Sequence, residues 1–306
     1  MKLVTYLTPT GERRAGVVAG ATVVDLAEGA RAIGTELPSD VVGLLRLGKD
    51  GLAVADRVRT EAEAGRVAGM AADEVRLTAA VPNPPKVLLL AGNYQSHITE
   101  GGAPPVDKSR INPRPFIKPG TAVIGTNDPI VIPPDSDTLD YEIEIAAVIG
   151  TRGKQIPVER AEEYIAGYVV FNDVSARSLK IAEGRAEREG DWFFDWLLGK
   201  WCDGFAAVGP YLVTRDEAGS PGSLEMALRV NGELRQHSSA GEMIFSIPEA
   251  IAFISRFVTL EPGDLLAMGT PGGVGDTTQT YLKAGDVVDA EIERLGRLVN
   301  PVAGSG

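Results

Sequence analysis

The chain has 306 residues, 44% of them apolar and 24% charged, and its 30 Lys and Arg against 42 Asp and Glu give a formal charge of −12. These values are typical of a globular chain with a sizeable core, and the acid excess argues against nucleic-acid or anionic-membrane partners. The single cysteine, Cys202, excludes an internal disulfide and Cys-based metal sites, and two histidines, His97 and His237, exclude a His-rich cluster.

The first part of the chain predicts a small module. The start lacks the apolar core of a signal peptide, and runs such as Val87–Ala91 are too short to span a bilayer, so we expect a cytoplasmic location. Three prolines in Val81–Pro85 predict a domain boundary, with a small domain over 1–80 and a larger one over 81–306. The patterns before it predict strands at Lys2–Tyr6, Ala15–Val18 and Ala21–Leu26, then helices at Val41–Leu47 and Gly51–Ala64.

The larger part predicts a strand-rich α+β domain. Asn231-Gly232 is a strong signal for a β-hairpin turn, and Leu295-Gly296 separates a second pair of strands. Strands are expected at Lys86–Ala91, Pro129–Ile132, Asp140–Ile149, Tyr168–Val174, Met226–Val230, Glu233–Gln236, Val287–Ile292 and Arg297–Val299. Helical spacing is present at Val158–Ala166, Ala176–Glu187 and Ile247–Phe257.

The polar segment His97–Pro115 is rich in Gly and Pro, and its length without a clear period predicts a lid. If its start is helical, His97 and Glu100 face the same way at spacing i, i+3. A carboxylate that orients an imidazole makes a water-activating base. The alternative is a surface histidine beside an incidental glutamate.

The segment Asp140–Glu144 carries alternating carboxylates, which in a strand place Asp140, Glu142 and Glu144 on one face. Buried like charges need a cation, and oxygen ligands suit Mg²⁺, Mn²⁺ or Ca²⁺. Asp173, at the end of the next apolar strand, would complete a set of three carboxylates with open metal positions. Two alternatives stay open: an edge strand with its acids in solvent, and a helix-capping role for Asp173.

Lys200 and Lys118 lie among apolar neighbours, where a buried ammonium could stabilise an enolate or a carboxylate, although a partly solvated surface lysine is the alternative. The loop Gly269–Gly275 lacks the Gly-Lys-Ser/Thr of a phosphate-binding loop. Its backbone N–H groups and the Thr270 hydroxyl could hold a small anion, or it could be a tight turn between strands.

Several motifs occur in a fixed order along residues 86–302. They are Gly92-Asn-Tyr-x-x-His97-x-x-Glu100, Phe116-Ile-Lys-Pro119, Asp140-Tyr-Glu-Ile-Glu144, Asn172-Asp-Val-Ser-Ala-Arg177, Lys200-x-x-Asp203-Gly-Phe205, Val208-Gly-Pro210, Met243-Ile-Phe245, Leu260-Glu-Pro-Gly-Asp264 and Gly269-Thr-Pro-Gly-Gly-Val-Gly275. This ordered set resembles the fumarylacetoacetate hydrolase family, including its acylpyruvase-like and 2-hydroxyhepta-2,4-diene-1,7-dioate isomerase-like members. The resemblance implies a mixed β-roll or barrel-like catalytic domain, a small N-terminal α+β domain and a homodimer.

The resemblance also implies a site for a 2-oxo acid. Mg²⁺, or else Mn²⁺ or Ca²⁺, would be held by Glu142, Glu144 and Asp173, and Lys200, His97 and Glu100 would be catalytic. The residues implied to contact or support the substrate are Thr270, Gly269, Arg177, Lys118 and Lys180. Lys180, with Ser178, departs from the family pattern and suggests a second anionic or hydroxyl-rich substrate end. Residues 183–196 look like an insert that lines the pocket.

The function expected from this resemblance is metal-dependent hydrolysis of a C–C bond in a 2,4-dioxo acid, of acylpyruvate or sugar-derived type, through a metal-bound enolate. Decarboxylation or isomerisation of a related 2-oxo acid or diacid by the same site is the first alternative. A non-catalytic, metal-stabilised binding protein is the alternative from another class.

Overall fold

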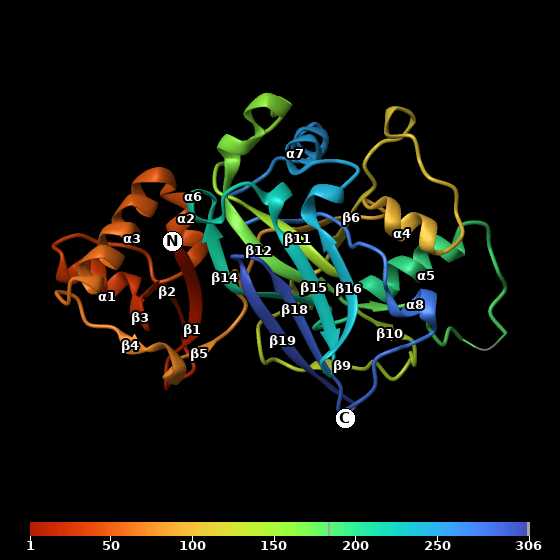
Figure 1. Cartoon of the computed structure of the whole chain (residues 1–306), viewed down its shortest axis with the longest axis horizontal. Coiled ribbons are helices and arrows are strands. Elements are labelled where there is room, and N and C mark those ends of the chain that lie inside the picture. Colours follow the sequence, from red (N-terminus) through yellow and green to blue (C-terminus); the bar gives the residue numbers. More distant parts are fainter. Residues whose placement is uncertain (183, 305–306) are drawn as a thin grey trace.

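The computed structural model describes residues 1–182 and 184–304. In Figure 1 the N-terminal helices lie at one end of the long axis, and α4 and α5 lie at the other. The α-helices of the described residues are α1 (Leu26–Ala32), α2 (Val41–Arg46), α3 (Gly48–Glu63), α4 (Gln95–Glu100), α5 (Asp191–Lys200), α6 (Arg215–Ala218), α7 (Ile247–Ser255) and α8 (Gly275–Thr278). No helix among the described residues combines the length and apolar character needed to cross a bilayer.

A twelve-stranded sheet forms the body, in the order β4-β3-β2-β1-β14-β12-β11-β17-β6-β7, with β5 on β1 and β8 on β14. Its strands are β1 (Lys2–Leu7), β2 (Arg13–Ala19), β3 (Thr22–Asp25), β4 (Met70–Ala71), β5 (Arg76–Leu77), β6 (Val87–Leu90), β7 (Pro115–Lys118), β8 (Val123–Ile124), β11 (Ile143–Ile149), β12 (Ile165–Asp173), β14 (Ala206–Thr214) and β17 (Leu265–Ala267). The N-terminal strands thus continue the same sheet through the pairing of β1 with β14. The boundary at 81–85 stays a prediction.

A five-stranded sheet in the order β16-β15-β18-β19-β9 lies in front of β12 and β14 in Figure 1. Its strands are β9 (Ile130–Val131), β15 (Glu225–Val230), β16 (Glu233–Ser239), β18 (Val287–Ile292) and β19 (Gly296–Ala303); a separate two-stranded sheet pairs β10 (Leu139–Asp140) with β13 (Ser175–Ala176). The predicted α+β, strand-rich class is confirmed, and so is the hairpin at Asn231-Gly232, where both residues have positive φ.

The two faces of β11 and β12 are both covered. Ile143, Ile145 and Val170 belong to the core beneath the five-stranded sheet, whereas Val148 and Phe171 belong to the core shared with the N-terminal strands and helices. Because neither face of these strands meets solvent, polar side chains on them are buried and must find partners inside the protein.

Two helix predictions need correction. The segment Ala176–Glu187 was expected to be helical, but the backbone N–H groups of Arg177 and Lys180 bond to Thr138 and Asp135, and no helix is present among its described residues (Glu183 lies outside them). The helix here is α5, immediately downstream. The segment Val158–Ala166 is a 3₁₀ helix at Val158–Tyr164 that runs into β12.

Candidate active site

The central feature of the site is a buried set of carboxylates from two neighbouring strands. Glu142 immediately precedes β11, Glu144 lies on it, and Asp173 ends β12. The register pairs Ile143 with Asn172, so all three side chains share one face of the sheet. Ligand atoms of the three lie within 4.8 Å of one another. The edge-strand alternative is therefore wrong, because β11 has a partner on each side and its carboxylates are buried.

Two buried lysines contact two of these acids, Glu142 and Asp173. Lys200 Nζ lies 2.9 Å from Glu142 Oε2 and 2.6 Å from Asp173 Oδ2. Lys118 Nζ lies 2.5 Å from the other Asp173 oxygen and donates to the carbonyls of Val174 and Phe205. Burial lowers the pKa of Lys118, but at Lys200 the charges of Asp173 and Glu142 outweigh burial and the pKa is raised. Neither lysine is a surface lysine.

Glu144 differs from its two neighbours. Among the described residues it has no cationic partner within ion-pair distance, and its only hydrogen bond is accepted from the Gly269 N–H at 2.7 Å. Burial, with the charges of Asp173 and Glu142, raises its pKa well above the ordinary value. At Glu142, by contrast, burial is outweighed by Lys200 and Arg177, and the pKa is lowered. One more positive charge beside Glu144 would complete the charge balance, and an all-oxygen donor set fits Mg²⁺ or Mn²⁺.

His97 and Glu100 form the predicted pair on α4. Nδ1 of His97 lies 2.5 Å from Glu100 Oε1, and His97 lines the same cavity as the three carboxylates. When the imidazole is neutral, this contact places the proton on Nδ1 and leaves Nε2 free to accept a proton. The segment after α4 is held by Gln95, which bonds both backbone groups of Val106, and by the ion pair of Lys108 with Glu249. Lid closure stays a prediction.

The glycine-rich loop binds carboxylates, but they belong to the chain itself. The N–H groups of Gly269, Gly273 and Gly275 donate to Glu144, Glu100 and Asp140, at 2.7, 2.6 and 2.7 Å. The expectation that these N–H groups would face a substrate anion is therefore wrong for these three glycines. The loop links the dyad on α4 to the acids of the central strands.

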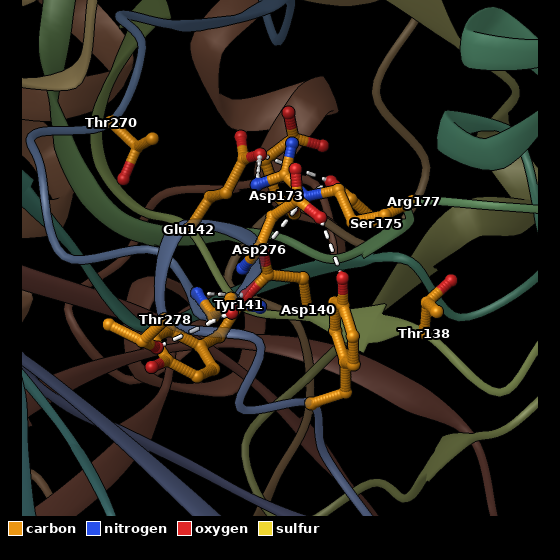
Figure 2. Close-up of polar contacts among 12 residues, drawn as sticks. Thr138, Asp140, Tyr141, Glu142, Asp173, Ser175, Arg177, Thr270, Asp276 and Thr278 are labelled. Carbon is orange, nitrogen blue, oxygen red and sulfur yellow. Dashed lines mark hydrogen bonds and ion pairs between the residues drawn. The ribbon is translucent and has the colours of Figure 1, made fainter. Parts of the chain in front are cut away.

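Asp140 lies apart from the three-carboxylate set, contrary to the expectation that it shares a strand face with Glu142 and Glu144. The strand is interrupted at 141–142, and Asp140 accepts from Arg177 Nε at 2.7 Å and from the N–H of Asp276 (Figure 2). Arg177 reaches Glu142 with its Nη2, 2.6 Å from Oε1. Arg177 thus links Asp140, which binds the glycine-rich loop, to Glu142 of the three-carboxylate set.

Gln236 is a site residue that the motifs did not single out. Its Oε1 accepts from the Ile143 N–H at 3.0 Å, which turns its Nε2 toward Thr270 Oγ1, 2.8 Å away. Because Thr270 accepts this bond, its own hydroxyl proton is free to point into the cavity. The sequence could have indicated this residue through the hairpin at Asn231-Gly232. The register of that hairpin pairs Gln236 with the inward-facing Leu228, which buries the Gln236 side chain.

A cavity of about 470 Å³ joins these residues. It is lined by Leu90, Ala91, Gly92, His97, Arg114, Pro115, Phe116, Glu142, Glu144, Asp173, Arg177, Trp192, Phe193, Trp196, Lys200 and Thr270. Lys118 lies behind Asp173, and Gly269 lies behind Glu144. Lys180 is outside: its side chain is 63% exposed and its ammonium lies 3.7 Å from Asp137. Within residues 183–196, the insert predicted to line the pocket, the residues that line the cavity are Trp192, Phe193 and Trp196 of α5.

Comparison with known proteins matches most of the chain to one family. Residues 86–303 match the family model described as fumarylacetoacetate (FAA) hydrolase, C-terminal. A curated relative, "Oxaloacetate tautomerase Fahd2a, mitochondrial" of Rattus norvegicus, is 38% identical over 99% of this chain and 91% of its own.

Solved structures share the whole fold. Maleylpyruvate hydrolase from Sphingobium sp. SYK-6, in complex with manganese(II) and pyruvate, is 26% identical with a TM-score of 0.76 over the full length of both chains. The 5-carboxymethyl-2-hydroxymuconate delta-isomerase of Mycobacterium smegmatis is 29% identical, with a TM-score of 0.71 over both full lengths.

Proposed function

Because this chain belongs to the fumarylacetoacetate hydrolase family, we propose that it is a divalent-metal-dependent enzyme that acts on a small 2-oxo acid through its enol form. The observation that carries the proposal is the pairing, in one cavity, of a three-carboxylate set with an uncompensated Glu144 and a histidine–carboxylate dyad. Neither feature alone would distinguish an enzyme from a metal-stabilised binding protein.

Glu142, Glu144 and Asp173 are the proposed ligands of Mg²⁺, with Mn²⁺ as the alternative that the Sphingobium structure contains. When bound, such an ion acts as a Lewis acid toward the 2-oxo carbonyl. The Thr270 hydroxyl, oriented by Gln236, is positioned to donate to the substrate carboxylate. Gly269 and Lys118 hold the ligands Glu144 and Asp173 in place and do not contact the substrate themselves.

The proton step is assigned to the dyad. His97 Nε2 takes a proton from the carbon beside the carbonyl, and Glu100 stabilises the imidazolium through Nδ1–H. Lys200 donates toward the enolate oxygen, where negative charge develops. Return of the proton to the oxygen gives the enol, and the reverse sequence gives the keto acid. This keto–enol tautomerisation is the activity printed in the name of the rat relative, and we propose it as the first candidate.

Hydrolysis of a 2,4-dioxo acid is the second candidate, favoured by the 2.5 Å contact of His97 with an anchored carboxylate. In this reaction His97 deprotonates water, which attacks the distal carbonyl. The C–C bond then breaks to give a carboxylic acid and the enolate of pyruvate, which takes up a proton at carbon. The similarity to the Sphingobium hydrolase supports this candidate. Decarboxylation of a related 2-oxo acid by the same site is kept as an alternative.

One assay separates these reactions. Oxaloacetate and acetylpyruvate are followed by their enol absorbance, with Mg²⁺ and with EDTA, while products are identified by chromatography. Magnesium-dependent relaxation without new products indicates tautomerisation, release of pyruvate with acetate indicates hydrolysis, and release of CO₂ indicates decarboxylation. A melting temperature that rises with Mg²⁺ without any turnover would instead favour the binding protein.

We also retain three expectations as proposals: a homodimer, a small N-terminal domain over 1–80, and a cytoplasmic location. The word "mitochondrial" belongs to the names of relatives and is not transferred to this chain. Sedimentation velocity of the full chain tests the dimer directly.

A further inference from the structure

The cavity has two chemically different walls. One carries the carboxylates, Lys200 and Thr270; the other is made by Phe116 of β7 and by Trp192, Phe193 and Trp196 of α5. A four-carbon acid held at the first wall would occupy only part of a cavity of about 470 Å³. The second wall therefore faces whatever the substrate carries beyond its reacting end.

The rings of the second wall form one continuous cluster. The centroids of Phe116 and Trp196 are 4.9 Å apart in an edge-to-face arrangement, and Phe193 stacks on Trp196 at 6.0 Å and 26°. Trp192 meets Phe193 edge to face, with the ring centroids 5.9 Å apart. Such a cluster offers both ring faces and ring edges to a further aromatic group.

This aromatic wall begins directly beside the reacting end. Lys200 Nζ, which bonds Glu142 and Asp173, lies 5.7 Å from the Phe116 centroid and 5.8 Å from the Trp196 centroid. A substrate whose 2-oxo acid end lies at the carboxylates therefore meets Trp196 first and Phe193 and Trp192 farther out. The geometry gives the distal group a direction along α5.

The outer rings are only partly covered. Trp192 is 75% exposed and Phe193 is 42% exposed, although both line the cavity. Covering exposed apolar rings with an apolar group lowers the free energy, because it removes their surface from water. The competing feature is Arg114, an exposed lining residue with no ion pair among the described residues, which could hold a second carboxylate.

We propose that Phe116, Trp192, Phe193 and Trp196 form a subsite for an aromatic or similarly bulky apolar substituent of the 2-oxo acid, an assignment that rests on the proposed function of the site. Four aromatic side chains of this wall could contact an apolar substituent, whereas only the exposed Arg114 guanidinium is proposed for a second carboxylate. The substrate class is accordingly a 2-oxo acid with an aryl group beyond the reacting carbon, and a four-carbon diacid is the poorer ligand.

Three unreactive probes test the assignment by calorimetry on the full chain. Oxamate supplies the 2-oxo acid end alone, N-phenyloxamate adds a phenyl ring, and N-oxalylglycine adds a second carboxylate. All have nitrogen in place of the enolisable carbon, so none can tautomerise. With Mg²⁺ present, N-phenyloxamate should bind at least about tenfold more tightly than oxamate, because the ring is buried against the wall.

Variants of α5 assign this preference to particular rings. Trp192→Ala with Phe193→Ala should reduce the ratio of the two affinities to within about threefold and leave oxamate binding unchanged. Phe194→Ala is the matched control: this ring is 60% exposed on the same helix and touches Phe193, but it does not line the cavity, so the ratio should be retained. If the double variant folds poorly, the comparison of oxamate with N-phenyloxamate on the wild-type protein still tests the subsite.

Several results would overturn the subsite. Equal binding of oxamate and N-phenyloxamate would refute it while leaving the proposed function intact. Tightest binding of N-oxalylglycine, lost in Arg114→Gln, would replace it with an anion site. A ratio unchanged in the double variant, together with an altered sedimentation coefficient, would assign the rings to contacts between copies. Absence of magnesium-dependent binding of all three probes would refute the proposed function itself.

Discussion

Glu100 accepts a hydrogen bond from the backbone N–H of Gly273 at 2.6 Å, and its other oxygen lies 2.5 Å from Nδ1 of His97. The same loop holds Glu144 through the N–H of Gly269. The proposed proton-transfer dyad and a proposed metal ligand are therefore fixed to one short stretch of backbone. A displacement of this loop should disturb both functions, whereas loss of the Glu100 charge should disturb only one.

The variant Glu100→Gln tests the dyad. The amide cannot stabilise an imidazolium, so we expect kcat to fall by about 10²-fold or more with the proposed 2-oxo acid. Magnesium affinity, measured by calorimetry, should change little. Thr99→Ala is the control, since this hydroxyl bonds mainly to the Gln95 carbonyl within α4. A wild-type kcat in Glu100→Gln would remove Glu100 from the mechanism.

The variant Gly273→Ala tests the loop. Gly273 has φ +101°, and an added Cβ would clash with the Arg235 carbonyl oxygen, so the loop must move. Gly285→Ala is matched in backbone conformation, at φ +94°, with nothing within 4 Å of its Cβ. The control should lose about 1 kcal/mol of unfolding free energy and keep activity and metal binding. Gly273→Ala should weaken both functions, and retention of both would show that the loop only closes a turn.

The variant Glu144→Gln tests the third carboxylate. It replaces a buried carboxyl group whose negative form is disfavoured by burial and by Asp173 and Glu142, and which has no cationic partner among the described residues. The protein in EDTA should therefore melt at the same or a higher temperature than wild type. In wild type, saturation with Mg²⁺ at 100 times Kd should add about 2.7 kcal/mol of stability. The variant should lose most of this gain. A full magnesium shift in Glu144→Gln would place the ion elsewhere.

The variant Gln236→Leu tests the orientation of Thr270. It leaves the buried N–H of Ile143 without its partner and frees the Thr270 hydroxyl to rotate, so we expect a loss of about 1–3 kcal/mol of stability. The KM should rise about tenfold with a smaller change in kcat, because the hydroxyl is proposed to bind the substrate carboxylate. Ser238→Ala on the same strand serves as the control. Equal loss of kcat and kcat/KM would point to a role in the chemical step instead.

The variant Asp25→Asn tests a charged cluster far from the site. Asp25 is bonded by Arg14 at 2.5 Å, by the Tyr6 hydroxyl and by the N–H of Glu28 at the start of α1. Burial would raise the pKa of Asp25, but the bonds from Arg14 and Glu28 outweigh it, and the pKa is lowered. Its stabilisation is therefore complete above the ordinary carboxyl pKa and is lost as pH falls through the lowered value.

Urea unfolding between pH 7 and pH 3 measures this effect. At pH 7 Asp25→Asn should be less stable than wild type by about 1–3 kcal/mol, and the difference should shrink toward pH 3. Glu12→Gln is the control, because Glu12 is 59% exposed and lies 3.9 Å from Arg14. Its effect should stay below about 0.5 kcal/mol. A difference that grows in acid would contradict the assignment.

Features set by short-range spacing were predictable. The period of two in a strand places Glu142 and Glu144 on one face, and the i, i+3 spacing brings His97 to Glu100; both relationships are present. The hairpin at Asn231-Gly232 follows from a turn that only certain residues adopt at low cost. The family was also predictable from the sequence, because its motifs occur in the same order along the chain.

The sequence by itself determined which residues carry the chemistry and the local elements that hold them, because propensity, capping and side-chain period act over a few residues. Only the tertiary structure decided between the two predicted roles of Asp173, by placing it with Glu142 and Glu144. It also decided that Glu144 has no cationic partner among the described residues, that Gln236 orients Thr270, and that Lys180 lies outside the cavity. These outcomes depend on the pairing of distant strands and on which charges burial brings together, and both are set by the packing of the whole chain.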